Sequence, residues 1–309
     1  MLDLILDSLR VVSLPTKTNF RGINHREVAL FQGPQGWAEF SPFLEYSDKE
    51  SSPWLACAIE AATQAPPALH RSSISVNATM PALNTESEIA RILAGFPGCT
   101  TIKIKVGTNE NEDLERIATV RRLSPESKIR IDVNGLWSLD QATKFLERCG
   151  EIEYVEQPCV TVEELRELKS RIDVKIVGDE ILRKSKNPFK VELQGAVDVL
   201  MLKVQPLGGI ANAHALAAHH KLPVVVSSAL ESAVGINYGL TLAASFKEMN
   251  FDCGLATGSL LASNVANLPI VDGKMQIQRV EPNFDGLEVS ADRFEWWKNR
   301  IMRTAALLG

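Results

Sequence analysis

Residues 128–180 read KIRIDVNGLWSLDQATKFLERCGEIEYVEQPCVTVEELRELKSRIDVKIVGDE, and this stretch decides the fold. Three short runs rich in Ile and Val alternate with two polar stretches in which apolar residues recur at helical spacing. Each apolar run ends at a carboxylate, namely Asp132, Glu156 and Asp179. This alternation predicts parallel strands joined by helices, with the three acids at one edge of the sheet.

The same interval continues on both sides of this stretch. Lys105 precedes Asp132 by 27 residues and Lys203 follows Asp179 by 24, while the acids are 24 and 23 residues apart. Five successive strand ends with a polar residue favour a closed barrel over a doubly wound open sheet, because many successive strands of a barrel contribute side chains to one site. We therefore expect a site at the carboxyl-terminal rim of a barrel.

The strand-helix alternation begins at about residue 73. The candidate strands are 73–78, 101–106, 128–133, 152–157, 174–179, 197–204, 222–228 and 251–256. Helical patterns between them cover 111–123, 138–149, 162–171 and 208–220. Ser138, with Gln141 three residues later, is typical of a capped helix start.

The flanking segments have a different pattern. Alternating hydrophobicity in residues 28–43, around Gly-Pro-Gln-Gly, predicts an antiparallel hairpin, and residues 48–65 predict a helix. Strand and helix patterns resume at 273–277 and 291–308. We expect this C-terminal segment to pack on the N-terminal unit.

Composition argues against several classes of partner. The net charge is only -5 and both signs are dispersed, so neither nucleic acid nor a membrane surface is an expected partner. Residues 1–10 lack a basic leader, and no apolar run reaches the roughly 20 residues that cross a bilayer. The 5 cysteines are scattered and never form C-x-x-C, which favours a reducing compartment and a cytoplasmic protein. The sequence names no partner protein.

The three carboxylates would repel one another if they met at one rim. Either some of them take up protons or a cation neutralises Asp132, Glu156 and Asp179. Three oxygen ligands without His or Cys favour Mg²⁺, with Mn²⁺ as a substitute, and leave positions for water and substrate. Helix caps or solvated loop charges are the alternative explanation for these acids.

The two lysines near residue 104 share one face of their strand, because alternate residues of a strand point the same way. Two neighbouring ammonium groups disfavour each other's protonation. We therefore expect Lys103 to lower the pKa of Lys105 from about 10.4 toward about 7 to 8, where a lysine acts as a base. A solvated lysine face on an edge strand would also explain the pair. Lys203 is expected across the barrel from Lys105.

Further contacts are expected around this set. Arg130 and Asn134 share the inward face of Asp132. Arg130 is expected either to contact substrate or to support the residues that do, and Asn134 to orient the metal ligands. Phe20 and Arg21 lie in a segment that we expect to be a mobile loop closing over the rim and touching substrate. Four residues after the seventh and eighth strands complete the expected substrate contacts: Ser227, Ser228, Thr257 and Gly258. Plain turn chemistry for the serines and a surface role for Arg21 are the alternatives.

Five short motifs carry a family resemblance. They are K-x-K at Lys103 and Lys105, R-I-D-V-N around Asp132, Y-V-E-Q-P around Glu156, G-D-E around Asp179 and M-L-K-V-Q-P-L-G-G around Lys203. In this order they resemble the enolase superfamily, and more narrowly its muconate-lactonising-enzyme-like branch. The resemblance implies an α/β fold: a modified TIM barrel, (β/α)7β, with an α+β capping domain. The expected ranges are 73–271 for the barrel, and 1–72 joined by 272–309 for the capping domain.

The resemblance also implies the chemistry. The three acids would hold Mg²⁺, the metal would bind a substrate carboxylate, and Lys105 would remove the proton α to it, giving a metal-stabilised enediolate. Lys203 would lend positive charge. Within the branch, residues 20–46 are similar to those of a lyase. This resemblance implies a syn dehydration of 2-succinyl-6-hydroxy-2,4-cyclohexadiene-1-carboxylate in menaquinone biosynthesis.

Two other functions stay open at this point. An N-acylamino acid racemase of the same superfamily would need both Lys105 and Lys203 as acid and base. Dipeptide epimerases of the branch carry an Asp-x-Asp at the eighth strand, whereas residues 253–263 read CGLATGSLLAS and contain no acid. A non-catalytic ligand-binding barrel is the third reading.

Overall fold

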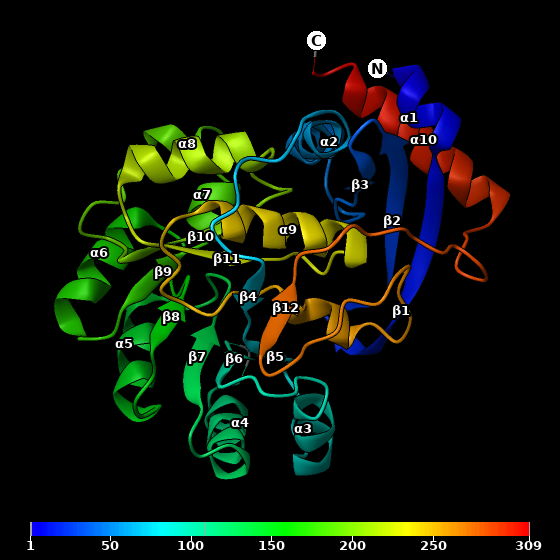
Figure 1. Cartoon of the computed structure of the whole chain (residues 1–309). Helices are drawn as coiled ribbons and strands as arrows, with labels where there is room; N and C mark the ends of the chain where they lie inside the picture. Colours follow the sequence, from blue (N-terminus) through cyan, green and yellow to red (C-terminus); the bar gives the residue numbers. More distant parts are fainter. Residues whose placement is uncertain (1, 108, 309) are drawn as a thin grey trace.

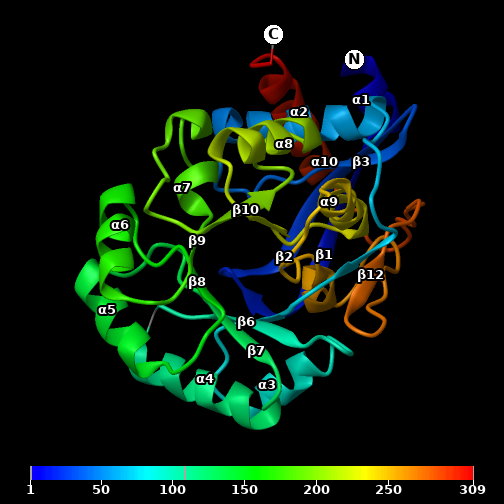
Figure 2. The same ribbon diagram turned by 60° about the vertical axis from the view of Figure 1, so that its left-hand side comes forward.

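Seven parallel strands in sequence order form the central sheet of the computed structural model, which describes residues 2–107 and 109–308. They are β5 (Ala78–Met80), β6 (Thr101–Lys105), β7 (Lys128–Asp132), β8 (Tyr154–Glu156), β9 (Ile176–Gly178), β10 (Val199–Lys203) and β11 (Val224–Ser227). Two isolated parallel bridges, Val76 with Cys253 and Ser227 with Gly254, join the ends of the sheet into a ring. Figure 2 shows this ring from its open end. The predicted barrel is confirmed.

Helices surround the ring. They are α3 (Glu86–Leu93), α4 (Glu110–Leu123), α5 (Leu139–Arg148), α6 (Val162–Arg171), the short α7 (Glu180–Arg183), α8 (Ile210–His220) and α9 (Ala233–Ser245), with 3-10 turns at Pro188–Lys190 and Ala256–Leu260. Ile129 and Ile131 of β7 pack outward in one apolar cluster with Ile117 of α4, which leaves the alternate residues of the strand facing inward. The predicted cap is confirmed, because Ser138 and Gln141 form a reciprocal capping box at the start of α5.

A separate unit lies against one side of the ring (Figure 1). It contains the antiparallel sheet of β1 (Arg10–Phe20), β2 (Ile23–Gly33) and β3 (Gly36–Phe40), with α1 (Leu2–Ser8), α2 (Asp48–Thr63) and α10 (Ala291–Ala305). Trp297 and Ile301 of α10 share an apolar cluster with Phe40 and Trp54. The expected packing of the C-terminal helix on the N-terminal unit is therefore confirmed. Residues 1 and 309 of the expected domain ranges lie outside the described residues.

Several elements differ from the sequence-based expectation. The predicted strand 73–78 is divided: β4 (Ser73–Ser75) pairs antiparallel with β12 (Lys274–Gln276), and the barrel strand begins only at Ala78. The predicted eighth strand, 251–256, contributes isolated bridges instead of a regular ladder. The sequence analysis also missed α9, because this helix is buried on nearly all sides and so lacks an amphipathic pattern.

Among residues 2–107 and 109–308, no helix combines the length and the apolar character required to cross a membrane.

Candidate active site

A cavity of about 410 Å³ opens at the carboxyl ends of the barrel strands. The tip of the β1–β2 hairpin reaches over it, and Figure 2 shows this hairpin extending toward the centre of the ring. The tip is a two-residue turn at Arg21 (φ +54°) and Gly22 (φ +79°). Positive φ at both positions is the geometry of the type I′ turn, which suits the twist of a hairpin. The segment expected as a loop is thus a tight turn.

Most of the expected site residues meet in this cavity. The expected residues that line it are Phe20, Arg21, Lys103, Lys105, Asp132, Asn134, Lys203, Ser227, Ser228 and Thr257. Glu156 and Asp179 lie directly behind the lining, where they bond to its lysines. Lys105 and Lys203 stand on strands four places apart in the sheet order, so they approach the cavity from opposite sides.

Two of the expected site residues, Arg130 and Gly258, lie outside the lining of this cavity. Arg130 faces inward as expected, but it is fully buried below the cavity, where its Nη1 donates to Asn77 Oδ1 at 3.1 Å and its guanidinium lies 4.6 Å from the Tyr154 ring centre. Strand alternation gives the face of a residue and not its depth in the barrel. Gly258 lines a different depression of the surface, together with Asn264.

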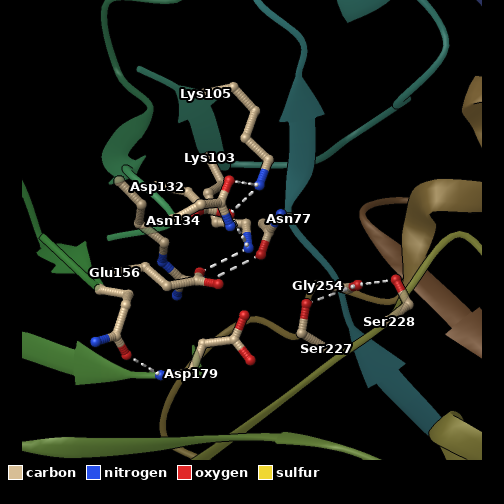
Figure 3. A network of polar contacts seen from close by, with 12 residues as sticks. Asn77, Lys103, Lys105, Asp132, Asn134, Glu156, Asp179, Ser227, Ser228 and Gly254 are labelled. Atoms are coloured by element: carbon tan, nitrogen blue, oxygen red, sulfur yellow. Dashed lines mark hydrogen bonds and ion pairs between the residues drawn. The ribbon is translucent and has the colours of Figure 1, made fainter. Parts of the chain in front are cut away.

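Three lysine-carboxylate pairs organise the floor of the cavity. Figure 3 shows the residues of the two pairs that involve Lys103 and Lys105. Lys105, Asp132 and Glu156 are in register on adjacent strands. Lys105 Nζ donates to Asp132 Oδ2 at 2.5 Å, and Lys103 Nζ donates to Glu156 Oε2 at 2.6 Å while lying 3.3 Å from Asp132 Oδ2. Lys203 Nζ donates to Asp179 Oδ2 at 2.5 Å. Each carboxylate therefore has a lysine partner from a neighbouring part of the rim.

These charges shift one another's titration. Burial alone would lower the pKa of Lys103, but the charges of Glu156 and Asp132 raise it above its ordinary value. Burial raises the pKa of Glu156, and the charge of Asp132 raises it further. Burial would also raise the pKa of Asp132, which Lys105 and Lys103 lower below its ordinary value. Lys103 is thus held in its charged form by acids, and its expected effect on the pKa of Lys105 stays a prediction.

The unpartnered oxygens at this floor fit a cation. Asp132 Oδ1 and Glu156 Oε1 are buried and accept no hydrogen bond. Leaving such atoms without a partner is costly, and an oxygen donor set suits a hard divalent ion. As the side chains lie, no three His, Cys, Asp or Glu residues within 2–107 and 109–308 are grouped tightly enough to hold a metal. Lysine ammonium groups bond to the other oxygen of each of these two acids, so a bound ion would take the free ones.

Asn134 has a more specific position than expected. It adopts φ +55°, and its side chain accepts a hydrogen bond from Lys105 Nζ at 2.9 Å and donates one to Glu180 Oε1 at 3.0 Å. Asn tolerates this left-handed backbone better than most residues. Asn134 therefore orients Lys105 in the structure described here.

Several residues that line the cavity were not expected from the sequence, and two of them, Tyr46 and Arg183, make polar contacts there. Arg183 Nε donates to Asp179 Oδ1 at 2.9 Å, an i,i+4 pair on α7. A signal for Arg183 was available, because a basic residue four positions after an acid is a known helical pairing. No local pattern marked Tyr46.

The cavity wall at residues 227–230 is supported by two buried acids. Glu39 of β3 accepts a hydrogen bond from Ser232 Oγ at 2.5 Å, and Glu231 accepts one from the backbone N–H of Ala229 at 2.6 Å. Burial raises the pKa of Glu231 to about 7, and the neighbouring charge of Glu39 contributes to the rise.

This pKa predicts a pH-dependent stability. The folded-state pKa of Glu231 lies above its unfolded-state pKa of about 4.3, so the protonated carboxyl group favours the folded protein. This contribution to stability is fully present below about pH 4.3 and is lost as the pH rises through 7. At pH 8.5, Glu231→Gln should be more stable than the wild type by up to about 3 kcal/mol, and the difference should shrink toward pH 5. Urea unfolding at both pH values measures this, with the exposed Glu147→Gln as control. An equal pH dependence in wild type and Glu231→Gln would contradict the prediction.

Comparison with known proteins identifies relatives along nearly the whole chain. The model described as enolase C-terminal domain-like matches residues 87–289, and the model described as enolase N-terminal domain-like matches residues 11–62. The chain is 47% identical to the o-succinylbenzoate synthase of Mycobacterium ulcerans (strain Agy99), over 98% of this chain and 95% of that protein. It is 44% identical to the o-succinylbenzoate synthase of Mycobacterium tuberculosis (strain ATCC 25618 / H37Rv), over 99% and 96%.

Solved structures agree on the fold. The L-Ala-D/L-Glu epimerase from Bacillus subtilis is similar with a TM-score of 0.74 and 21% identity, covering 91% of this chain and 98% of that chain. The muconate lactonizing enzyme from Pseudomonas putida is similar with a TM-score of 0.73 and 19% identity, covering 93% and 97%. At these identities the likeness concerns architecture, and the choice between chemistries comes from the closer sequence relatives and from the site.

Proposed function

This chain belongs to the enolase superfamily, and from that premise we propose that it catalyses the o-succinylbenzoate synthase reaction. The reaction is the syn dehydration of 2-succinyl-6-hydroxy-2,4-cyclohexadiene-1-carboxylate to o-succinylbenzoate, a carbon-oxygen lyase step in menaquinone biosynthesis. The observation that carries the proposal is the 47% identity over 98% of the chain to a protein of that name. The cavity supports it with the lysines and acids that such chemistry needs.

A divalent metal fits the proposal. Asp132, Glu156 and Asp179 would hold Mg²⁺, or Mn²⁺ in its place, through the oxygens that include the two unpartnered ones. Such an ion supplies positive charge for the negative charge that develops on the substrate carboxylate as the α-proton leaves.

Lys105 is the proposed proton carrier. Its side chain is 26% exposed and faces the cavity, whereas that of Lys103 is 6% exposed and is held between two acids. Asp132 and Asn134 hold the Lys105 ammonium group from behind. In its neutral form Lys105 would take the α-proton, and the resulting ammonium would then protonate the departing hydroxyl on the same face.

Lys203 is proposed to act through its charge. It lies on the opposite side of the cavity, paired with Asp179, and would stabilise the ring system as negative charge develops.

A Lys203 series tests this role. Lys203→Ala should lower kcat by about 10² to 10³-fold, and Lys203→Arg, which keeps the charge with a different shape, should lower it less. The measurement is kcat at saturating substrate and metal, with the exposed Lys186→Ala as control. An unchanged kcat in Lys203→Ala would contradict the assignment.

The succinyl group is assigned to the outer part of the cavity. Phe20 and Arg21 reach it from the hairpin tip, while Ser227, Ser228 and Thr257 line the barrel side. Ser228 Oγ donates to the carbonyl of Gly254 at 2.6 Å and lies 2.8 Å from Thr257 Oγ1, so these hydroxyls are already ordered. We propose that Arg21 supplies the charge for the second carboxylate and that the hydroxyls set its position.

A direct assay tests the proposed function. Purified protein mixed with Mg²⁺ and the hydroxycyclohexadiene substrate should form the aromatic product. The absorbance of this product measures the reaction. Absence of product with metal bound would defeat the proposal.

We also propose a cytoplasmic location, which the five unpaired cysteines support.

The second candidate is N-acylamino acid racemase activity. The presence of a lysine on each side of the cavity favours it, because racemisation needs proton transfer on both faces. In deuterated water, deuterium entering both enantiomers of an N-acyl amino acid would reveal this activity, with or without the dehydration.

A further inference from the structure

Arg183 connects the capping unit to a proposed metal ligand. From α7 its Nε donates to Asp179 Oδ1 at 2.9 Å, and its Nη2 pairs with Glu180. Its remaining nitrogen, Nη1, donates to Tyr46 Oη at 3.2 Å. The side chain is only 10% exposed, so these partners define its position. Tyr46 lies 137 residues away in sequence, in the segment that follows β3.

The same phenol oxygen holds the hairpin tip. Arg21 Nη2 donates to Tyr46 Oη at 3.0 Å, and the Arg21 guanidinium lies 3.8 Å from the centre of the Phe43 ring. Glu45 Oε1 lies 3.5 Å from Arg21 Nη2, and Asp179 Oδ1 lies 2.9 Å from Arg183 Nε. Because each guanidinium has its own acid, both can approach one neutral oxygen at little electrostatic cost. Tyr46 is therefore an acceptor shared by two arginines from different parts of the chain.

Tyr46 itself is fixed from behind. The buried Arg300 of α10 donates from Nη2 to the carbonyl of Tyr46 at 2.8 Å and to that of Phe43 at 3.0 Å. The Tyr46 ring also packs edge-on against Phe43 and Trp54, with ring centres 5.8 and 6.2 Å away. The backbone and the ring of Tyr46 are thus held by the capping unit.

We propose that Tyr46 is a positioning residue that ties the hairpin tip over the cavity to the carboxylate of Asp179. One hydrogen bond keeps Arg21 at the mouth of the cavity, and the other aligns Arg183 so that Asp179 presents its oxygens to the metal. Tyr46 makes no chemical step. The substrate named in the test rests on the proposed function, whereas the hydrogen bonds of Tyr46 are observed in the structure.

Tyr46→Phe tests the bridge, since it removes the hydroxyl and keeps the ring. Loss of one hydrogen bond to a charged group changes a binding or conformational equilibrium constant by about tenfold or more. KM for the cyclohexadiene substrate should rise about tenfold, while kcat falls by less than about threefold. The dissociation constant of Mn²⁺, measured without substrate from the spectrum of free Mn²⁺, should rise several-fold. Trypsin should cleave after Arg21 faster, because the guanidinium is released from its partner; mass spectrometry of the fragments measures this rate.

Tyr238→Phe is the matched control. Its hydroxyl also joins α2 to the barrel side, by donating to Glu60 Oε1 at 2.7 Å, but it does not line this cavity. The control should leave KM, Mn²⁺ affinity and cleavage at Arg21 at wild-type values. Wild-type values for all three in Tyr46→Phe, or equal changes in both variants, would overturn the proposal. If the wild type forms no aromatic product, the proposed function fails, whereas Mn²⁺ binding and cleavage at Arg21 still decide the role of Tyr46.

Discussion

Lys105→Ala is expected to lower kcat for dehydration by roughly 10⁴-fold, the upper end of what a single proton-transfer group contributes. The large effect follows from its use in two successive steps, removal of the α-proton and protonation of the leaving hydroxyl. The truncation leaves the carboxylates partnered, because Lys103 Nζ remains 3.3 Å from Asp132 Oδ2. The fold and Mn²⁺ binding should therefore survive, and kcat should carry most of the loss.

The conservative replacement sharpens this result. Lys105→Arg keeps a positive charge, but a guanidinium does not release its proton in a protein, so it should be nearly as inactive as alanine. Lys144→Ala, at an exposed position on α5, should behave as the wild type. Turnover at saturating substrate and Mg²⁺ is the measurement. A kcat within tenfold of wild type in Lys105→Ala would remove Lys105 from the proton-transfer role.

Removal of divalent metal is expected to abolish turnover, and added Mg²⁺ should restore it. EDTA tests this directly.

Glu156→Gln should weaken Mn²⁺ binding by at least about 100-fold, since it replaces a ligand and even residues that only orient ligands contribute 10 to 100-fold. The amide oxygen can still accept from Lys103, so the ammonium keeps a partner in its buried position.

The control for this prediction lies three residues earlier. Glu153 pairs with Arg130 below the cavity, at 2.6 Å, and Glu153→Gln should retain Mn²⁺ affinity. Titration calorimetry compares the two variants. Equal Mn²⁺ affinity in Glu156→Gln and Glu153→Gln, or full turnover in EDTA, would contradict the proposed metal site.

Much of the barrel followed from local patterns. α6 begins and ends at the predicted residues, 162 and 171, because its cap and its apolar spacing are both local signals. The nearly constant interval between strand ends also placed Lys105, Asp132 and Glu156 in register. β1 was not predicted, because Pro15 and a run of polar residues interrupt its alternation of apolar and polar residues. It forms a strand by pairing with β2, and the sequence of β1 alone does not reveal this pairing.

Other features depend on distance across the fold. Arg130 and Asp132 share a face of β7 and are two residues apart. Even so, Asp132 lines the cavity, whereas Arg130 is buried outside its lining. The bridge from Arg21 through Tyr46 to Arg183 joins segments whose proximity no local pattern encodes.

The sequence by itself determined that the two lysines of β6, the three acids and Lys203 gather at the rim. The reason is that strand alternation and the repeat of one strand plus one helix act along the chain. Only the tertiary structure decided which lysine pairs with which acid, how deep each residue lies and what covers the cavity. The stagger between neighbouring strands sets the ion pairs, with Lys103 on Glu156 and Lys203 on Asp179. The packing of the capping unit sets the roof, and both arise from contacts between residues that are distant in sequence.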